Sequence, residues 1–383
     1  MTTTMAHRGF NVKLFPLTAT VTALLGCSLT VSAQTLPPLT VPPAQTFPNA
    51  IYPKVAEHLN RAREIAGDDL YPAFMRRCVL SQIYSQYANS AEDPLQLHPR
   101  QVFDNLYFIG QGAVSAWAVK TSLGLVIIDS LNNASEAEFI LVEGLRKLGL
   151  NPAAMKYVII THEHGDHYNG VRYLQDTYGV LAVASDIAWT TMDNGSPTRP
   201  RRNITVYDGQ DWHVGDTTFH FTVTPGHTPG ALSTILPVYD HGRRHMGAIY
   251  GGFGIPGSQP NKILQLQSLD RFAQATRRAN VDVLLANHQT QDMSLYNLDL
   301  LNHRRLHQRF EELNSAPGYY PELPWSAFRD PHPYVVGERT YQRYIDLQQE
   351  CIRVSAARAG QQLSVDGTPV VTRLEPAFRR EPH

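Results

Sequence analysis

Three histidines and one aspartate lie within six consecutive residues, in the stretch VIITHEHGDHYNG. The four residues are His162, His164, Asp166 and His167. They follow YVIIT, a β-branched run that predicts a buried strand ending at Thr161. Burying such groups without partners costs roughly several kcal/mol each. Imidazole and carboxylate are the usual ligands of zinc, so the cluster predicts a bound divalent metal.

The glycine inside this cluster lets one short loop serve two metal ions. Gly165 permits a sharp turn between the strand end and the helix expected to follow. His162 and His164 then point one way, while Asp166 and His167 point another. Each pair still needs a further ligand from elsewhere in the chain.

Two more histidines follow predicted strands. His227 lies in the turn of TVTPGHTPGA, and His288 comes directly after VDVLLAN. Among 16 histidines a single one is more often an ordinary surface or core residue than a ligand. Three predicted strands are each followed by histidine, and this pattern favours one shared metal site.

The motifs THEHGDHYNG, TPGHTPG and the late NH resemble those of the metallo-β-lactamase superfamily, in order over Val102 to Asp292. This resemblance implies an α/β fold, the αββα sandwich. It also implies two zinc ions per chain, and the residues that match by position are His162, His164 and His227 for one ion, and Asp166, His167 and His288 for the other. That set resembles the subclass without a cysteine ligand. Asp129, which ends LVIIDS, would steady the histidine loop without binding metal.

The resemblance further implies a hydrolase that uses metal-activated hydroxide to open an amide bond, as a β-lactamase does, with a role in antibiotic resistance. Two zinc ions acidify water and polarise a carbonyl, so no serine or cysteine nucleophile is needed. Asp166 would orient the nucleophile as well as bind metal. The expected substrate is a small molecule with a carbonyl group.

Two features at the end of one predicted strand leave the substrate open. In MGAIYGGFGIP the glycines stand where many superfamily members carry an aspartate bridging both metals, which argues against thioester hydrolases and typical lactonases. Phe253 and Ile255 stand where the cysteine-free β-lactamases have serines that hold the substrate carboxylate. Arg199, in SPTRPRR, is either a replacement cation or part of a solvated loop. The alternatives are a lactone or ester hydrolase and an inactive binding or regulatory member.

A further aromatic stretch follows residue 318. It contains Tyr319, Tyr320, Trp325 and Phe328. These side chains would either cap the pocket or pack on the surface.

Composition excludes some partners. The chain has 383 residues, 43% hydrophobic and 17% charged, with a net charge of −1. A near-neutral chain without a basic stripe is not typical of nucleic-acid binding. We expect an ordinary globular enzyme, and its oligomeric state stays open.

The first 33 residues have the pattern of a secretory signal. Arg8 and Lys13 precede an apolar stretch, and small residues lead up to Ala33. LLGC resembles the lipobox of bacterial lipoproteins, so cleavage before Cys27 would leave a lipid-anchored protein and cleavage after Ala33 a soluble one. We therefore expect a secreted or periplasmic protein that meets a membrane only if it is lipidated.

Export would leave Cys78 and Cys351, which form either one disulfide or two separate thiols. The remaining chain divides by pattern into a proline-rich lead-in (34–50), a helical extension (51–95), a catalytic domain (100–300) and a second helical extension (301–383).

Overall fold

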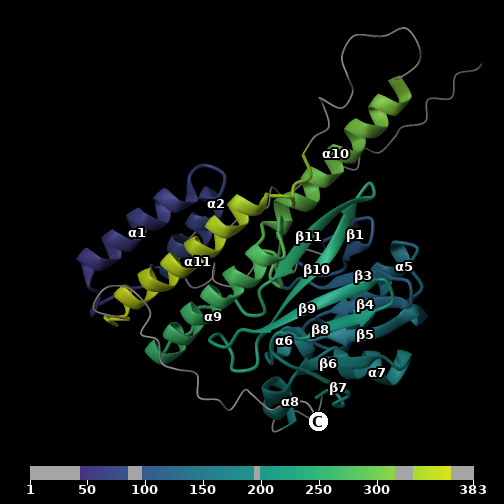
Figure 1. Cartoon of the computed structure of the whole chain (residues 1–383), viewed down its shortest axis with the longest axis horizontal. Coiled ribbons are helices and arrows are strands. Elements are labelled where there is room, and N and C mark those ends of the chain that lie inside the picture. The colour runs from purple at the N-terminus through teal and green to yellow at the C-terminus, as the bar shows by residue number, and fades with distance from the viewer. Residues whose placement is uncertain (1–43, 85–96, 194–198, 315–330, 364–383) are drawn as a thin grey trace, which may run out of the picture. The chain divides into compact units, whose positions relative to one another are not determined.

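Two β-sheets lie face to face at the centre of the protein, and helices cover their outer faces (Figure 1). The computed structural model describes residues 44–84, 97–193, 199–314 and 331–363. The predicted α/β class and αββα sandwich are confirmed. Within the described ranges, every helix is too short or too polar to cross a membrane.

The first sheet has the order β1-β2-β3-β4-β5-β6-β7. Its strands are β1 (Arg100–Phe103), β2 (Leu106–Phe108), β3 (Trp117–Thr121), β4 (Gly124–Ile128), β5 (Met155–Ile159), β6 (Leu181–Ser185) and β7 (Ile204–Val206). The pairs from β1 to β4 are antiparallel, and those from β4 to β7 are parallel. In the parallel half the carboxyl ends of the strands meet at one edge, which is where ligands usually bind in α/β sheets.

The second sheet has the order β12-β11-β10-β9-β8. Its strands are β8 (Asp211–Val214), β9 (Thr217–Val223), β10 (Leu232–Asp240), β11 (Arg243–Ile249) and β12 (Val283–Leu285). Only the β11–β12 pair is parallel among these strands. Alternate residues of β9, such as Phe219 and Phe221, are buried, as expected for a strand with one face in the core.

Three clusters of buried hydrophobic residues hold together the four layers, which are helices, sheet, sheet and helices. One fills the space between the sheets, and one lies between each sheet and its helices. The helices beside the first sheet are α4 (Ala134–Glu136), η3 (Ala137–Val142), α5 (Glu143–Lys147), η4 (Pro152–Ala154), α6 (Gly165–Tyr168), α7 (Val171–Tyr178) and α8 (Asp186–Asp193). The remaining helices are α1 (Tyr52–Ala66), α2 (Tyr71–Phe74), η1 (Met75–Leu80), α3 (Ser81–Ile83), α9 (Gln259–Arg278), α10 (Ser294–Asn314) and α11 (Glu338–Arg358).

The two predicted helical extensions meet outside the second sheet. Helix α11 packs against α1 and α9, as Figure 1 shows. Cys78 of η1 and Cys351 of α11 form a disulfide, so the alternative of two separate thiols does not hold. Segments 273 residues apart in sequence are thereby joined.

Helix α9 begins at Gln259, because Ser258 caps it by accepting a hydrogen bond from the backbone of Asn261 and Pro260 occupies its first turn. Residues 134–147 form three consecutive helical segments, of which the middle one is a π-helix.

Candidate metal centre

The six predicted ligands come from three loops that each follow a strand. The histidine loop runs from β5 into α6, His227 lies on the turn between β9 and β10, and His288 follows β12. The structure brings their side chains together in two groups of three.

His162, His164 and His227 form the first group, in which one ring nitrogen from each lies within 4.8 Å of the others. The ring centroids are 5.0 Å apart for His162 and His164, and 4.6 Å apart for His164 and His227. Nε2 of His162 is buried and has no hydrogen-bond partner among the described residues. A buried nitrogen is costly to leave unpaired, so this atom fits a metal ligand.

Asp166, His167 and His288 form the second group. Nε2 of His167 lies 3.2 Å from Nε2 of His288 and 3.2 Å from Oδ2 of Asp166, and the third separation, His288 to Asp166, is 3.6 Å. Tetrahedral zinc, with ligands at about 2.0–2.1 Å, separates its ligand atoms by about 3.3–3.4 Å. The residues present therefore fit zinc in spacing as well as in chemical type.

Hydrogen bonds on the far side of the rings orient the second group. Nδ1 of His167 donates to Oδ2 of Asp129 (2.7 Å), and Nδ1 of His288 donates to the carbonyl of Ala113 (3.0 Å). Both rings thus direct Nε2 inward, the arrangement that commonly fixes a metal-binding histidine. Asp129 is fully buried and also accepts the backbone and hydroxyl hydrogens of Thr161, at 2.9 and 2.8 Å. Asp129 therefore holds both ends of the histidine loop.

Burial and mutual proximity keep most of these histidines neutral. Burial is the main cause that lowers the pKa of His227 to about 3 and of His288 to about 4, and it lowers the pKa of His162 as well. Neutral imidazole is the form that binds metal. Burial lowers the pKa of His167 as well, but the neighbouring carboxylates of Asp129 and Asp166 have the larger combined effect and raise it to about 10. Without metal, the His167 ring is therefore protonated, and its positive charge is balanced by the carboxylates of Asp129 and Asp166.

Glu163 connects the first group across two loops, a role that the sequence reasoning missed. Its buried carboxylate accepts hydrogen bonds from the hydroxyl of Thr228 and the backbone N–H of Gly230, both at 2.8 Å. Glu163 stands between two ligands of the histidine loop, while both of its partners come shortly after His227 on the same turn. The acid inside HEH is the sequence signal that could have indicated this link.

Asn287, also missed, ties three segments behind the site. Its side-chain amide donates to Oγ1 of Thr161 and to the carbonyl of Gly251, both at 2.9 Å. The residue is fully buried and directly precedes His288. It therefore fixes the loop after β12 against the histidine loop.

Glycines after β11 make room for the His227 ring. A Cβ atom on Gly254 would lie 2.0 Å from Cε1 of His227, and one on Gly252 would lie 2.9 Å from its Cβ. These positions follow the strand end where the resemblance led us to look for a bridging aspartate. Among the described residues, no carboxylate belongs to both ligand groups.

The predicted pocket residues lie in different surroundings. Phe253 is 3% exposed and packs against the rings of Tyr250 and Tyr344, with centroids 4.7 and 5.7 Å away. Ile255 packs, partly buried, against the same helix-side core. Arg199 is exposed and donates to the backbone carbonyl of Asp193. None of the three makes a hydrogen bond or ion pair with either ligand group, since Phe253 and Ile255 pack against the helix-side core and Arg199 donates to the Asp193 carbonyl.

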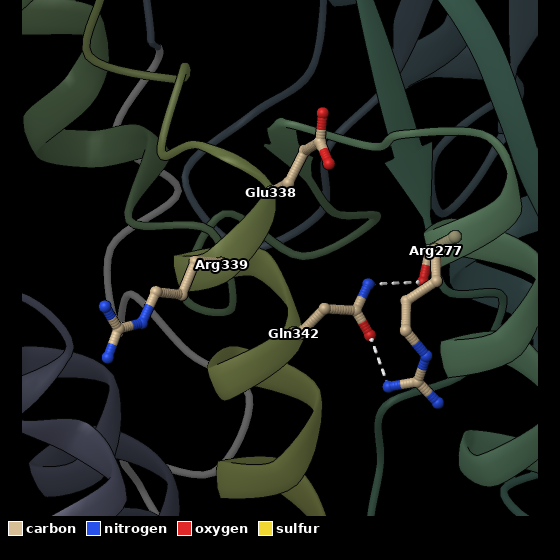
Figure 2. A pocket seen from close by; sticks show the side chains of 5 residues that line it. Arg277, Glu338, Arg339 and Gln342 are labelled. Carbon is tan, nitrogen blue, oxygen red and sulfur yellow. Dashed lines mark hydrogen bonds between the residues drawn. The ribbon is translucent and has the colours of Figure 1, made fainter.

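The aromatic stretch from Tyr319 to Phe328 lies outside the described residues. A separate surface pocket of about 330 Å³ lies between the end of α9 and the start of α11, as Figure 2 shows. Arg277 donates to Gln342 across it at 3.1 Å. None of the six predicted ligands lines this pocket.

Comparison with known proteins agrees with the site. Residues 109–240 match the family model described as the metallo-beta-lactamase superfamily. A hydroxyacylglutathione hydrolase of Francisella tularensis subsp. novicida is 34% identical over 102 residues, 27% of this chain. A lactamase-like protein of Pestalotiopsis microspora is 30% identical over 122 residues, 32% of this chain. The chain spans only 34% of the length of each of these relatives.

Solved structures show the same fold. The native FEZ-1 metallo-beta-lactamase of Legionella gormanii superposes with a TM-score of 0.54 at 18% identity, covering 70% of this chain and 99% of that one. A metallo-beta-lactamase of Cronobacter sakazakii gives a TM-score of 0.50 at 21% identity, covering 67% and 93%. The family match includes the histidine loop and the His227 turn, so this part of the chain is similar to the metallo-β-lactamase superfamily in sequence, and the solved structures share its fold.

Proposed function

We propose that this protein is a zinc-dependent hydrolase that opens an amide bond of the β-lactam type. The observation that carries the proposal is the pair of three-residue groups of metal-binding side chains, the second of them with zinc-like spacing, and no carboxylate shared between them. The names of the relatives, a hydrolase in one case and metallo-beta-lactamases in others, support hydrolysis. An inactive binding or regulatory member would not need to retain all six ligands.

The six predicted ligands would bind two zinc ions, and one of them would also orient water. His162, His164 and His227 would hold one zinc ion, and the second group would hold the other. Zinc, when bound, supplies Lewis acidity that polarises a carbonyl and acidifies water near neutral pH. Asp166 is the only carboxylate in the two groups. Burial raises its pKa, but the hydrogen bond and charge of His167 outweigh burial, so the net shift is downward and the carboxylate is ionised. Its side chain is 31% exposed, so it can accept a hydrogen bond from water and orient it toward the carbonyl carbon.

Glycines at the end of β11 support the amide over the ester alternative. Many lactonases and thioester hydrolases of this superfamily place a bridging aspartate there, and this chain has Gly251 and Gly252. Lactone or ester hydrolysis remains the second candidate, because the relatives include a hydroxyacylglutathione hydrolase.

The test is hydrolysis of a chromogenic cephalosporin and of a chromogenic ester by the zinc-loaded protein. We expect the cephalosporin to be opened, and we expect turnover to be lost in His162→Ala and after EDTA treatment. Turnover of the ester alone would favour the second candidate. Turnover of neither, by a protein that binds zinc, would contradict both.

We also propose that the protein is exported. The signal-like pattern of residues 1–33 and the Cys78–Cys351 disulfide support this, because structural disulfides persist in oxidising compartments. The intact mass of the mature protein tests it: cleavage after Ala33 gives a soluble form, and a lipid on Cys27 gives an anchored one. An uncleaved N-terminus in the producing cell would contradict export.

A further inference from the structure

The hydrogen bonds behind His162 leave this ligand with one tautomer. Its ring is 1% exposed, and Nε2 has no hydrogen-bond partner among the described residues. A neutral histidine can bind a metal through Nε2 only when its hydrogen is on Nδ1. Two polar neighbours lie beside Nδ1, the hydroxyl of Thr161 at 3.3 Å and the side-chain nitrogen of Asn287 at 3.4 Å. What these two groups accept or donate therefore decides the position of the hydrogen.

The hydroxyl of Thr161 has one hydrogen, and it donates this hydrogen to Asp129. Its Oγ1 lies 2.8 Å from Oδ2 of Asp129, a carboxylate oxygen that also accepts from Nδ1 of His167 at 2.7 Å. The backbone N–H of Thr161 donates to the other oxygen of the same carboxylate at 2.9 Å. Both residues are fully buried, so the hydroxyl is held in this direction. Toward His162 it therefore offers a lone pair and no hydrogen.

The side-chain amide of Asn287 has no hydrogen left for His162. Nδ2 carries two hydrogens, and it donates one to Oγ1 of Thr161 and the other to the carbonyl of Gly251, both at 2.9 Å. Turning the amide over would place its oxygen against the Gly251 carbonyl, acceptor against acceptor, so the orientation of the amide is fixed. Among the described residues, the Thr161 hydroxyl is then the acceptor available to Nδ1 of His162.

We propose that Thr161 is a positioning residue of the metal centre, whose hydroxyl accepts the Nδ1 hydrogen of His162 and so fixes the tautomer in which Nε2 is free to bind metal. Asn287 completes the arrangement because both of its amide hydrogens are donated elsewhere. The second nitrogen of a metal-binding histidine commonly donates to a carboxylate, a carbonyl or water, and here a hydroxyl takes that place. The inference rests on the proposed function for the identity of the metal, but the tautomer is a property of the metal-free chain.

The carboxylate of Asp129 thus orients one ligand of each group by two different routes. It accepts from His167 directly, and it orients His162 through the hydroxyl of Thr161. Removing that hydroxyl should therefore affect the first group and spare the second. It also frees one amide hydrogen of Asn287, and Nδ1 of His162, 3.4 Å away, is the acceptor within reach. The ring would then carry its own hydrogen on Nε2, where the metal should bind.

The first test reads the tautomer from a proton–nitrogen correlation spectrum of the histidine rings, recorded on the EDTA-treated full-length protein at neutral pH. Loss of one ring signal in His162→Gln assigns the residue. We expect the hydrogen of His162 on Nδ1 in wild type and in Thr161→Ser, which keeps the hydroxyl. We expect it on Nε2 in Thr161→Val, which keeps the shape without the hydroxyl. Thr234→Val is the matched control, because Thr234 is fully buried and its Oγ1 has no hydrogen-bond partner among the described residues.

The second test measures zinc affinity by competition with a chelator, in variants that keep one ligand group each. With His288→Ala the first group remains, and Thr161→Val should weaken zinc binding about 10–100-fold, the usual cost of losing a group that orients a metal ligand. With His227→Ala the second group remains, and the same change should leave zinc affinity unchanged. Thr161→Ser and Thr234→Val should have little effect in either case. Neither test uses a substrate, so a protein that hydrolyses nothing, for which the proposed function fails, still tests the role of Thr161.

Three results would overturn the inference. One is a wild-type His162 with its hydrogen on Nε2, a measurement that needs no variant of Thr161. Another is an unchanged tautomer in Thr161→Val, or in Thr161→Ala if the valine variant does not fold. The third is a loss of zinc affinity of equal size for both ligand groups, which would indicate a general effect on the fold.

Discussion

Removing the carboxylate of Glu163 should disable one metal group and spare the other. Glu163 contacts Thr228 and Gly230, which both follow His227 on the same turn, so it holds the turn that carries this ligand against the histidine loop. In Glu163→Ala the turn loses that support, and the backbone N–H of Gly230 is left buried without a partner.

The magnitude follows from the two hydrogen bonds. Each bond to a charged group contributes about 1.5–3 kcal/mol, so we expect the free energy of unfolding to fall by about 3–6 kcal/mol. Loss of a group that orients a metal ligand typically weakens metal affinity by about 10–100-fold. Glu163→Gln is the matched control, because its amide can accept from Gly230 and donate to Thr228. It should lose less than half as much stability.

Two mutant backgrounds distinguish the effect of Glu163 on one ligand group from its effect on the other. With His288→Ala the chain keeps the first group, and adding Glu163→Ala should weaken zinc binding about 10–100-fold in competition with a chelator. With His227→Ala it keeps the second group, and the same addition should leave zinc affinity unchanged. Equal losses in both backgrounds, or none in either, would refute the reasoning.

Three further predictions concern packing, cross-linking and pH. Gly254→Ala should weaken zinc binding because its Cβ would overlap the histidine ring of the β9–β10 turn, whereas Gly257→Ala, where nothing lies within 4 Å, should not; equal effects would refute this. Reducing the Cys78–Cys351 disulfide should lower the free energy of unfolding by about 2–5 kcal/mol in urea titrations, and an unchanged midpoint would count against it. Burial raises the pKa of Asp292 to about 7, because the folded protein favours the protonated carboxyl. Protonated Asp292 therefore contributes fully to the free energy of unfolding below about pH 4, and this contribution is lost as pH rises through 7. Asp292→Asn should flatten this part of the stability–pH curve, and an unchanged slope would contradict the assignment.

Much of the fold could be predicted from the sequence because its signals are local. Runs such as GLVII and YVII are β-branched and bounded by turn residues, and they form β4 and β5. The start of α9 is harder to predict, because FGIPGSQP has the composition of a loop and only the capping role of Ser258 marks the helix start. The meeting of η1 with α11 depends on contacts between segments 273 residues apart, which no local pattern reveals.

The candidate site also contains some residues that local motifs predict and others whose roles depend on distant contacts. The six ligands lie in compact motifs, so their residue types and order indicated that they would gather. Glu163 and Asn287 act through partners 65 and 126 residues away, and only the folded chain pairs them. Phe253 stands at the expected strand end, but the direction of its side chain is set by packing against Tyr344.

Anomalous diffraction at the zinc edge, from crystals of the zinc-loaded protein, tests the central claim most directly. A dinuclear centre predicts two peaks about 3.5–4 Å apart, the spacing of two-metal sites. His162, His164 and His227 should surround one peak, and Asp166, His167 and His288 the other. A single peak, or zinc bound away from these six side chains, would contradict a dinuclear centre.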